Sequence, residues 1–247
     1  MTNTIALFSI KGGVGKTAAA VNLAALSALH GRRTLIWDLD PQAATTWYLK
    51  SAAVDGPSIR KIFKGKGLGK AIRRTPHRNL WLLPSDLSYR DAERVLDDLK
   101  HGVFQIAHML EALYDEYDEI WIDCPPGLSL LADNVIRAAD VLLVPLIPTH
   151  LSERTWFQLV EHMDQEKIHP EHFHAFLSMV DRRRQLHRGF RTGPGRRIPQ
   201  MLPAEIPYAS VVEQMGVDRM PTVFSQPRTP AAQAYFALWQ QVDALLD

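Results

Sequence analysis

The sequence contains one cysteine, Cys124, in 247 residues. A lone thiol cannot form an internal disulfide or supply a cysteine metal site within one chain, so disulfide-stapled and zinc-thiolate folds are excluded. Cys124 follows an apolar run, and we interpret it as a small buried residue rather than a reactive thiol. The formal net charge is only +1. Overall charge therefore indicates no partner, and any basic surface has to be local.

Long apolar runs are also lacking. None approaches the roughly 20 residues that cross a bilayer. The N-terminal residues 1–5, MTNTI, lack the basic start and apolar stretch of a secretory signal and read directly as a strand. We therefore expect a cytoplasmic protein.

Strand-like and helical patterns alternate along the chain. Helical spacing predicts helices over residues 18–29, 90–113 and 231–246, and short apolar runs predict strands at 5–8, 34–37, 80–83, 119–122, 141–144 and 173–180. Such alternation indicates an α/β fold with a mainly parallel twisted sheet and helices on both faces, in three layers. The length suits one domain over residues 1–247. Two glycine-rich basic stretches, 64–70 and 182–199, are expected to be surface loops.

A glycine-rich loop, KGGVGKT at residues 11–17, lies between a predicted strand and a predicted helix. In this context glycines let backbone N–H groups face an anion, and the helix N-terminus adds its positive dipole end. Lys16 is expected to reach the β- and γ-phosphates, and Thr17 to ligate Mg²⁺. The alternative is a glycine turn that merely begins a helix. The expected nucleotide ligands in this region are Lys11, Gly12, Gly13, Val14, Gly15, Lys16, Thr17 and Ala18.

Carboxylates follow two of the predicted strands. Asp38 and Asp40 come after strand 34–37, and alternation places them on one side of the extended chain. Asp123 follows strand 119–122, the Walker B arrangement, and is expected to hold Mg²⁺ through water. Ligands of open α/β sheets bind at this carboxyl edge. The alternative for the first pair is a capping role in a strand-to-helix turn.

The loop departs from the ordinary P-loop pattern, because Ile10 replaces its first glycine and a second lysine, Lys11, opens the motif. This resembles the deviant Walker A motif of the ParA/MinD family, which includes chromosome and plasmid partition ATPases. The resemblance implies a P-loop NTPase domain that binds ATP or ADP with Mg²⁺ and hydrolyses ATP slowly until a partner stimulates it. It also implies that Lys11 crosses a homodimer interface to the partner's phosphates. The alternative is a solvated loop lysine.

The same resemblance assigns further roles. Asp40 positions or activates the attacking water, which with Lys11 and Lys16 makes the catalytic set. Asp38 supports the Mg²⁺ shell formed with Thr17 and Asp123. Gly127, in the run DCPPG, offers its N–H to the γ-phosphate. Three residues are expected to contact the base: Met179, Asp181 and Pro207. One departure is Ala18, where the family often has a second hydroxyl that touches the α-phosphate.

Arginines crowd the second loop: Arg182, Arg183, Arg184, Arg188, Arg191, Arg196 and Arg197. Only Asp181 is acidic nearby in the sequence. Such a region suits salt-sensitive, nonspecific binding of DNA, as in the partition group, and predicts a nucleoid-associated location. The alternatives are a solvated loop and a site for an acidic protein.

Three other classes share this loop. A MinD-like membrane-associated ATPase would need a basic amphipathic tail, but residues 236–247 contain no lysine or arginine. Iron–sulfur reductases need two cysteines per subunit. A small-molecule ligase stays open, without an identified substrate pocket. The favoured mechanism is an ATP-dependent homodimer that binds DNA and is reset when a ParB-like or cargo-side protein stimulates hydrolysis; the sequence does not identify the DNA or protein cargo.

Overall fold

The computed structural model describes residues 2–50, 56–99 and 102–246. Within them lies an eight-stranded sheet of order β3-β4-β2-β5-β1-β6-β7-β8, parallel except at edge strand β3. The strands are β1 (Asn3–Leu7), β2 (Thr34–Asp38), β3 (Arg73–Arg74), β4 (Leu80–Leu83), β5 (Glu119–Asp123), β6 (Val141–Leu146), β7 (His172–Val180) and β8 (Met201–Pro207).

Helices connect the strands. The α-helices are α1 (Lys16–Leu29), α2 (Ala44–Tyr48), α3 (Ile59–Phe63), α4 (Leu68–Ala71), α5 (Ala92–Asp97), α6 (Gln105–Glu111), α7 (Leu130–Ala138), α8 (His150–Glu166), α9 (Gln185–Gly189), α10 (Ser210–Glu213), α11 (Met215–Asp218), α12 (Thr222–Ser225) and α13 (Pro230–Asp243). The 3₁₀ helices are η1 (Leu87–Asp91), η2 (Gly102–Phe104) and η3 (Pro194–Arg197).

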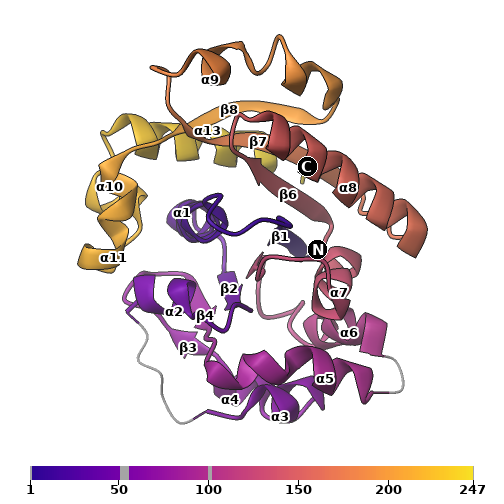
Figure 1. The fold of residues 1–247 in the computed structure, drawn as a ribbon. Helices are drawn as coiled ribbons and strands as arrows, with labels where there is room; N and C mark the ends of the chain where they lie inside the picture. Colours follow the sequence, from indigo (N-terminus) through magenta and orange to yellow (C-terminus); the bar gives the residue numbers. More distant parts are fainter. Residues whose placement is uncertain (1, 51–55, 100–101, 247) are drawn as a thin grey trace.

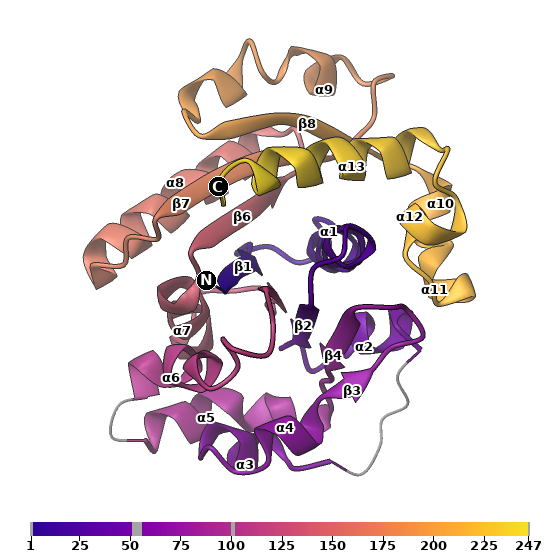
Figure 2. The same ribbon diagram turned by 180° about the vertical axis from the view of Figure 1, so that it is seen from behind.

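Two apolar layers cover the sheet, as the sequence predicts. Helices α1, α12 and α13 pack on one face. Helices α3 to α8 pack on the other. Figures 1 and 2 show α1 and α7 on opposite sides of β1. A parallel sheet buried on both faces explains why β2, β5 and β6 are buried at every position.

Helix α13 is docked onto this core. Its residues Tyr235, Leu238 and Trp239 are buried. Arg32 forms ion pairs with both Glu119 of β5 and Asp243 at the end of α13. The C-terminal helix is therefore held by apolar packing and by a charge bridge to the central sheet. Among the described residues, no helix is long and apolar enough to span a membrane.

Local sequence explains where the principal helices begin and end. Ser129, Thr149 and Thr229 each accept a backbone N–H bond at the N-terminus of α7, α8 and α13. After α1 the chain turns at Gly31, where φ is 94°. The left-handed region is open to glycine without steric penalty, so the predicted end of this helix is confirmed.

The predicted continuous helix over residues 90–113 is wrong. The described part of this region forms η1, α5, η2 and α6 in succession, while residues 100–101 lie outside the described chain. The chain turns back on itself at Gly102, where an added Cβ would collide with the carbonyl oxygen of Leu96. The apolar residues do recur at helical spacing, but they lie on separate short helices, which bury them in the same core.

Both predicted surface loops contain helical turns. The stretch 64–70 leads into α4, and the stretch 182–199 contains α9 and η3. Phe190 is fully buried between the last two, with Gly195 packed directly against its ring. A buried aromatic side chain thus anchors a segment whose composition alone indicates a loop. The sequence does not predict strand β8 either; it follows this segment as the sheet's edge strand.

Candidate nucleotide-binding site

The strand register brings the predicted loop and carboxylates to one edge of the sheet. Asp123 at the end of β5 pairs with Leu7 of β1 on one side and with Asp38 of β2 on the other. The loop from residue 9 to residue 15 leaves β1 at this edge and enters α1. Because parallel strands end together, residues far apart in sequence form one site.

The loop has the backbone that its glycines permit. Gly13 and Gly15 have φ of 71° and 87°, in the left-handed region. A side chain on Gly15 would also come within 2.7 Å of the Ser178 hydroxyl, so this position is restricted by space as well as by conformation. The N-terminus of α1 begins at the next residue, with its free backbone N–H groups at the loop.

Lys16 is nearly buried, with 7% of its surface exposed. Its ammonium donates to the carbonyl oxygen of Lys11, at 3.3 Å. Burial lowers the pKa of Lys16, and the carboxylate of Asp123 opposes that shift. A cation that has lost most of its hydration and has few partners is suited to bind an anion such as a phosphate group.

The Asp123 carboxylate is buried and only half paired. Its Oδ2 accepts a hydrogen bond from the Thr45 hydroxyl at 2.8 Å, whereas Oδ1 has no partner among the described residues. Burial raises the pKa of Asp123 to about 6, and the hydrogen bond from Thr45, the nearby Thr17 hydroxyl and the charge of Lys16 oppose this rise. An unpaired buried carboxylate oxygen beside a threonine hydroxyl fits a hard cation such as Mg²⁺.

Asp38 is occupied by neighbouring donors. Its Oδ2 accepts the backbone N–H and the hydroxyl of Thr46 at 2.8 and 2.7 Å, and its Oδ1 accepts the N–H of Asp40 at 3.1 Å. Burial, followed by the charge of Asp123, raises the pKa of Asp38 to about 8. No three histidine, cysteine or acidic side chains among the described residues are arranged to hold a metal ion by themselves, so phosphate and water oxygens would have to complete a Mg²⁺ shell here.

Asp40 lies at the rim of the site. It is partly exposed, and its Oδ1 accepts the N–H of Gln42 at 2.9 Å. Its charge acts on both Lys16 and Asp123, which places it close to the phosphate loop. A carboxylate that is partly exposed and near the expected phosphates has access to water, as its predicted role requires.

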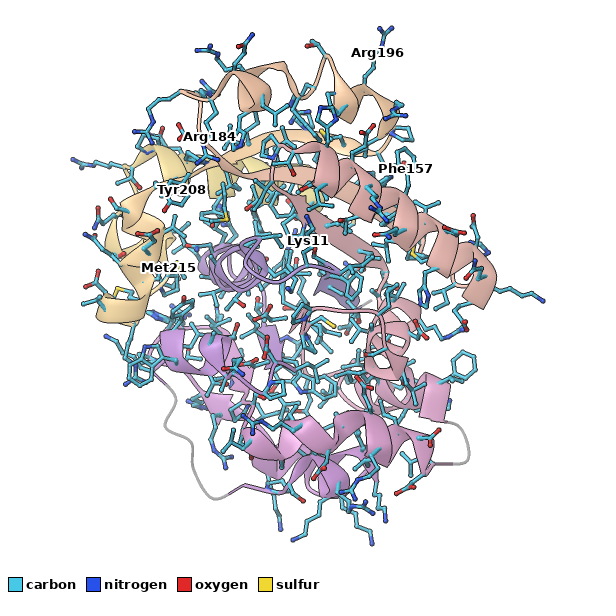
Figure 3. The ribbon with its side chains drawn as sticks, viewed as in Figure 1. Lys11, Phe157, Arg184, Arg196, Tyr208 and Met215 are labelled. Atoms are coloured by element: carbon cyan, nitrogen blue, oxygen red, sulfur yellow. The ribbon has the colours of Figure 1, made fainter. Side chains whose placement is uncertain are left out.

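Two further predicted residues, Gly127 and Lys11, lie on the loops at this edge of the sheet. Gly127 has φ of 105°, with nothing within 4 Å of the position of a Cβ, and Pro126 lies 3.9 Å from that position on Gly12. The loop after β5 thus stands opposite the phosphate loop. Lys11, labelled in Figure 3, is partly exposed, and its ammonium has no hydrogen-bond or ion-pair partner among the described residues.

A cavity of about 160 Å³ continues from the loop toward β8. Its walls include Gly13, Gly15 and Ala18 together with Met179 and Pro207. Two of the three predicted base contacts are therefore beside the phosphate loop. Ser178 and Tyr208 also line this cavity, although neither is among the predicted base contacts.

The third predicted base contact, Asp181, is not part of this cavity. Its carboxylate pairs with Arg183 at 2.9 Å and with Arg184 at 3.7 Å. Hydrogen bonds from Arg183 lower the pKa of Asp181 to about 2. The structure thus uses Asp181 to hold two arginines at the end of β7.

The arginine region is less basic than the sequence predicts, because the fold adds two distant carboxylates. Glu205 pairs with Arg182 and Arg191, and Glu153 pairs with Arg197. Arg188 and Arg196 are exposed and form no ion pair with any described residue. Seven arginines against Asp181, Glu205 and Glu153 leave four positive charges. In Figure 3, the side chain of Arg196 points away from the protein.

Two threonines of the site were also missed. Thr45 and Thr46 lie on α2, a few residues after the two aspartates, and hold the carboxylates of Asp123 and Asp38. The sequence feature that could have identified them is a pair of hydroxyl residues at the start of the helix that follows the two aspartates. Hydroxyls in that position are common as caps, so sequence alone does not distinguish the two uses.

A phosphate loop between β1 and α1, with carboxylates at the ends of β2 and β5, defines a P-loop nucleotide-binding fold. The sequence model of a family described as AAA domain matches residues 2–172. The chain belongs to this family, and within it to the ParA/MinD group of deviant Walker A P-loop ATPases.

Curated relatives support this assignment. The chain is 36% identical over 147 residues to the chromosome-partitioning ATPase Soj of Treponema pallidum, covering 59% of this chain and 57% of that protein. It is 38% identical over 144 residues to the chromosome partitioning protein ParA of Myxococcus xanthus, covering 58% and 51%. The chain thus spans about half the length of the curated relatives it matches.

Solved structures match over the whole chain. McdA from Cyanothece has a TM-score of 0.85 at 20% identity and full coverage of both chains, which shows the common fold. Cobyrinic acid a,c-diamide synthase from Mycobacterium smegmatis, solved with ADP and magnesium, has a TM-score of 0.82 at 27% identity, covering 100% of this chain and 94% of that one.

Proposed function

We propose that this chain is a ParA-like ATPase that binds ATP with Mg²⁺ and hydrolyses it to ADP and phosphate. The observation that carries the proposal is the unpaired Oδ1 of buried Asp123, which lies at the phosphate loop together with the nearly buried ammonium of Lys16. A buried carboxylate oxygen without a partner is stabilised when it binds a cation, and a buried ammonium is stabilised when it binds an anion. Mg²⁺ and a triphosphate supply both partners at once.

We assign to the side chains the roles that the resemblance to the ParA/MinD family implies, and their positions support these roles. Backbone N–H groups of the loop and Lys16 would bind the phosphates, while Thr17 and Asp123 would hold Mg²⁺, whose charge would offset the negative charge of the phosphates. Asp38 supports the metal shell through its neighbours. Asp40 at the rim orients the attacking water. Gly127 offers its N–H to the γ-phosphate, and Met179 and Pro207 contact the base; Asp181 does so only if it leaves its arginines.

We propose that ATP holds two copies of the chain together, and that the whole chain acts as one unit. The ammonium of Lys11 is free to reach the nucleotide of a second subunit, because it has no partner among the described residues. Hydrolysis then removes the γ-phosphate and with it a reason for the subunits to associate. This is a two-state equilibrium biased by ligand.

The ATP-bound dimer is proposed to bind DNA nonspecifically through its arginine region and to position DNA or a protein cargo on the nucleoid. The net positive charge of that region and its two unpaired arginines support this. The relatives named as chromosome-partitioning proteins support the biological setting. A cargo-side, ParB-like protein would stimulate hydrolysis and reset the cycle.

A second candidate function is an ATP-dependent small-molecule ligase. The specific observation in its favour is the 27% identity and full-length fold match to a cobyrinic acid diamide synthase. Formation of ADP only in the presence of a metabolite, with a new covalent product, would favour this function over the switch.

The deciding experiment is titration of a fluorescent ATP analogue with Mg²⁺ into wild-type protein and Lys16→Ala. We expect the variant to lose most of its nucleotide affinity, because the loop loses its buried cation. Lys66→Ala, an exposed lysine outside the site, is the matched control and should bind normally. Equal binding by Lys16→Ala would show that the nucleotide site is elsewhere.

A further inference from the structure

A second cavity, of about 740 Å³, lies next to the candidate nucleotide site. It is bounded by the start of α2, by the segment after β4 and by Arg219, which directly follows α11. Figures 1 and 2 show α11 against α2 on this side of the molecule. Its volume falls within the roughly 300–1,000 Å³ typical of small-molecule sites. None of the roles proposed above uses this space.

The cavity contains one cationic group, held in a fixed place. The guanidinium of Arg219 stacks over the ring of Trp47, with its central carbon 4.1 Å from the ring centroid. Its Nε donates to the carbonyl oxygen of Trp47 at 2.9 Å. The Trp47 indole in turn donates to the carbonyl oxygen of Gly216, also at 2.9 Å. Both ends of α11 thus lock this stack against α2.

The outer donors of Arg219 stay available. Its two terminal nitrogens form no hydrogen bond or ion pair with any described residue. A guanidinium presents these nitrogens as a planar fork that matches the two oxygens of a carboxylate. Because stacking and the Nε bond already fix the group, little side-chain entropy is lost when an anion binds.

The rest of the wall is mainly apolar. Pro41, Ala43, Trp47 and Leu87 line it, and Trp47 and Leu87 are 53% and 67% exposed. Ser85 also lines the cavity, and its buried hydroxyl has no hydrogen-bond partner among the described residues. Large exposed apolar side chains and an unpaired buried polar group are both unusual in a surface without a ligand.

The carboxylate of Asp86 also lines the cavity, and its negative charge disfavours binding of an anion there. Its Oδ1 accepts the backbone N–H of Ser88 at 2.6 Å, as the cap of η1. It is therefore engaged by a backbone donor, whereas the fork of Arg219 is not. A ligand anion is thus favoured at Arg219, and a cationic probe measures the contribution of Asp86.

We propose that this cavity binds a small carboxylic acid with an apolar or aromatic body. The carboxylate pairs with the terminal nitrogens of Arg219, and the body packs against Pro41, Ala43 and Leu87. This site is independent of ATP hydrolysis. It is nevertheless adjacent to the nucleotide site, since Thr46 lines the cavity and also holds the carboxylate of Asp38.

The test uses three probes with one phenyl body and different charges: 3-phenylpropionate, 3-phenylpropionamide and 2-phenylethylamine. Ligand-observed NMR titration of the full chain without nucleotide gives the three affinities. We expect the acid to bind at least about tenfold more tightly than the amide, as for a charge-assisted hydrogen bond. In Arg219→Gln the acid should bind no better than the amide, while the amide affinity is unchanged.

Two further variants keep the test decisive if Arg219→Gln fails to fold. Leu87→Glu changes an exposed side chain at the cavity wall and should abolish binding of the acid while improving binding of the amine. Arg154→Gln, an exposed arginine on α8 outside the cavity, is the matched control and should leave all three affinities unchanged. The proposal is overturned if no acid binds at millimolar concentration, if acid and amide bind equally, or if the amine binds best to the wild-type protein.

Discussion

Thr46 donates both its backbone N–H and its hydroxyl to the same carboxylate oxygen of Asp38, at 2.8 and 2.7 Å. The hydroxyl also accepts the N–H of Ser85, at 3.0 Å. One side chain of α2 therefore connects the end of β2 with the segment after β4. Since Asp38 is fully buried, these donors offset part of the cost of burying its carboxyl group.

Replacing Thr46 with Val should remove the hydroxyl while keeping the shape and the backbone donor. A buried carboxylate and a backbone N–H then each lose a partner, so we expect the free energy of unfolding to fall by about 2 kcal/mol. Urea denaturation measures this change. Thr46→Ser keeps the hydroxyl and is the control; a Thr46→Val protein that is no less stable than Thr46→Ser would contradict the role given to these hydrogen bonds.

The buried aspartates predict a pH dependence of stability when Mg²⁺ is chelated. Burial raises the pKa of Asp38 to about 8 and that of Asp123 to about 6, from a usual 3.8. Between about pH 4 and pH 8 the folded state therefore binds more protons than the unfolded state, and its stability from these groups falls as pH rises. Urea denaturation across this range should show a shallower decline for Asp38→Asn. An identical slope in both proteins would contradict the assignment.

Lys11→Ala should separate nucleotide binding from association. The side chain has no described partner within its own subunit, so its loss should leave stability and monomer folding unchanged. If it reaches the second subunit's phosphates, ATP-dependent dimerisation will be lost. Light scattering after size exclusion, with and without ATP and Mg²⁺, measures this, with Lys66→Ala as control. A Lys11→Ala protein that still dimerises with ATP would remove the proposed role.

Asp40→Ala should bind ATP but hydrolyse it at least about tenfold more slowly, because the group proposed to orient water is missing. The partly exposed position makes a large loss of stability unexpected. Phosphate release and mass in solution should show a persistent ATP-bound dimer. Asp86→Ala removes an exposed carboxylate outside the phosphate site and should turn over normally. Wild-type turnover by Asp40→Ala would place the water elsewhere.

Neutralising the two unpaired arginines should weaken DNA binding more than neutralising two of the arginines that form ion pairs. Arg188→Gln with Arg196→Gln removes charges that no described carboxylate balances. For each arginine–phosphate pair that is removed, the slope of log affinity against log salt should become shallower by about 0.9. Fluorescence anisotropy with duplex DNA at several salt concentrations measures both quantities. Arg94→Gln, on α5, is the control. An unchanged slope would assign these arginines to another partner.

The phosphate loop and the three aspartates were predictable because their signals are local. Each follows a short apolar run, and parallel strands bring the ends of such runs to one edge. The missing parts depend on contacts between distant segments. Arg197 forms an ion pair with Glu153, which lies 44 residues away in the sequence, and no local sequence pattern predicts this pair. Sequence therefore overestimates the charge of the arginine region.

Two errors in the secondary structure also have physical causes. The apolar spacing of residues 90–113 predicts which residues face the core, but it does not predict whether they lie on one continuous helix. The close approach of Gly102 to Leu96 interrupts the helix. Strand β8 contains Pro203 and Glu205 and alternates in burial. It is an edge strand, where proline is tolerated, and so lacks the continuous apolar run of the central strands.

The docking of α13 limits how the end of this chain can take part in any cycle. Detaching the helix would expose Tyr235, Leu238 and Trp239 to water, at about 2 kcal/mol for each side chain, and would separate Arg32 from Asp243. The free energy needed to detach the helix is therefore comparable to the free energy of unfolding of many domains. Nucleotide-dependent changes should therefore be sought at the phosphate edge, while a fluorophore attached near the end of α13 should report a constant environment throughout turnover.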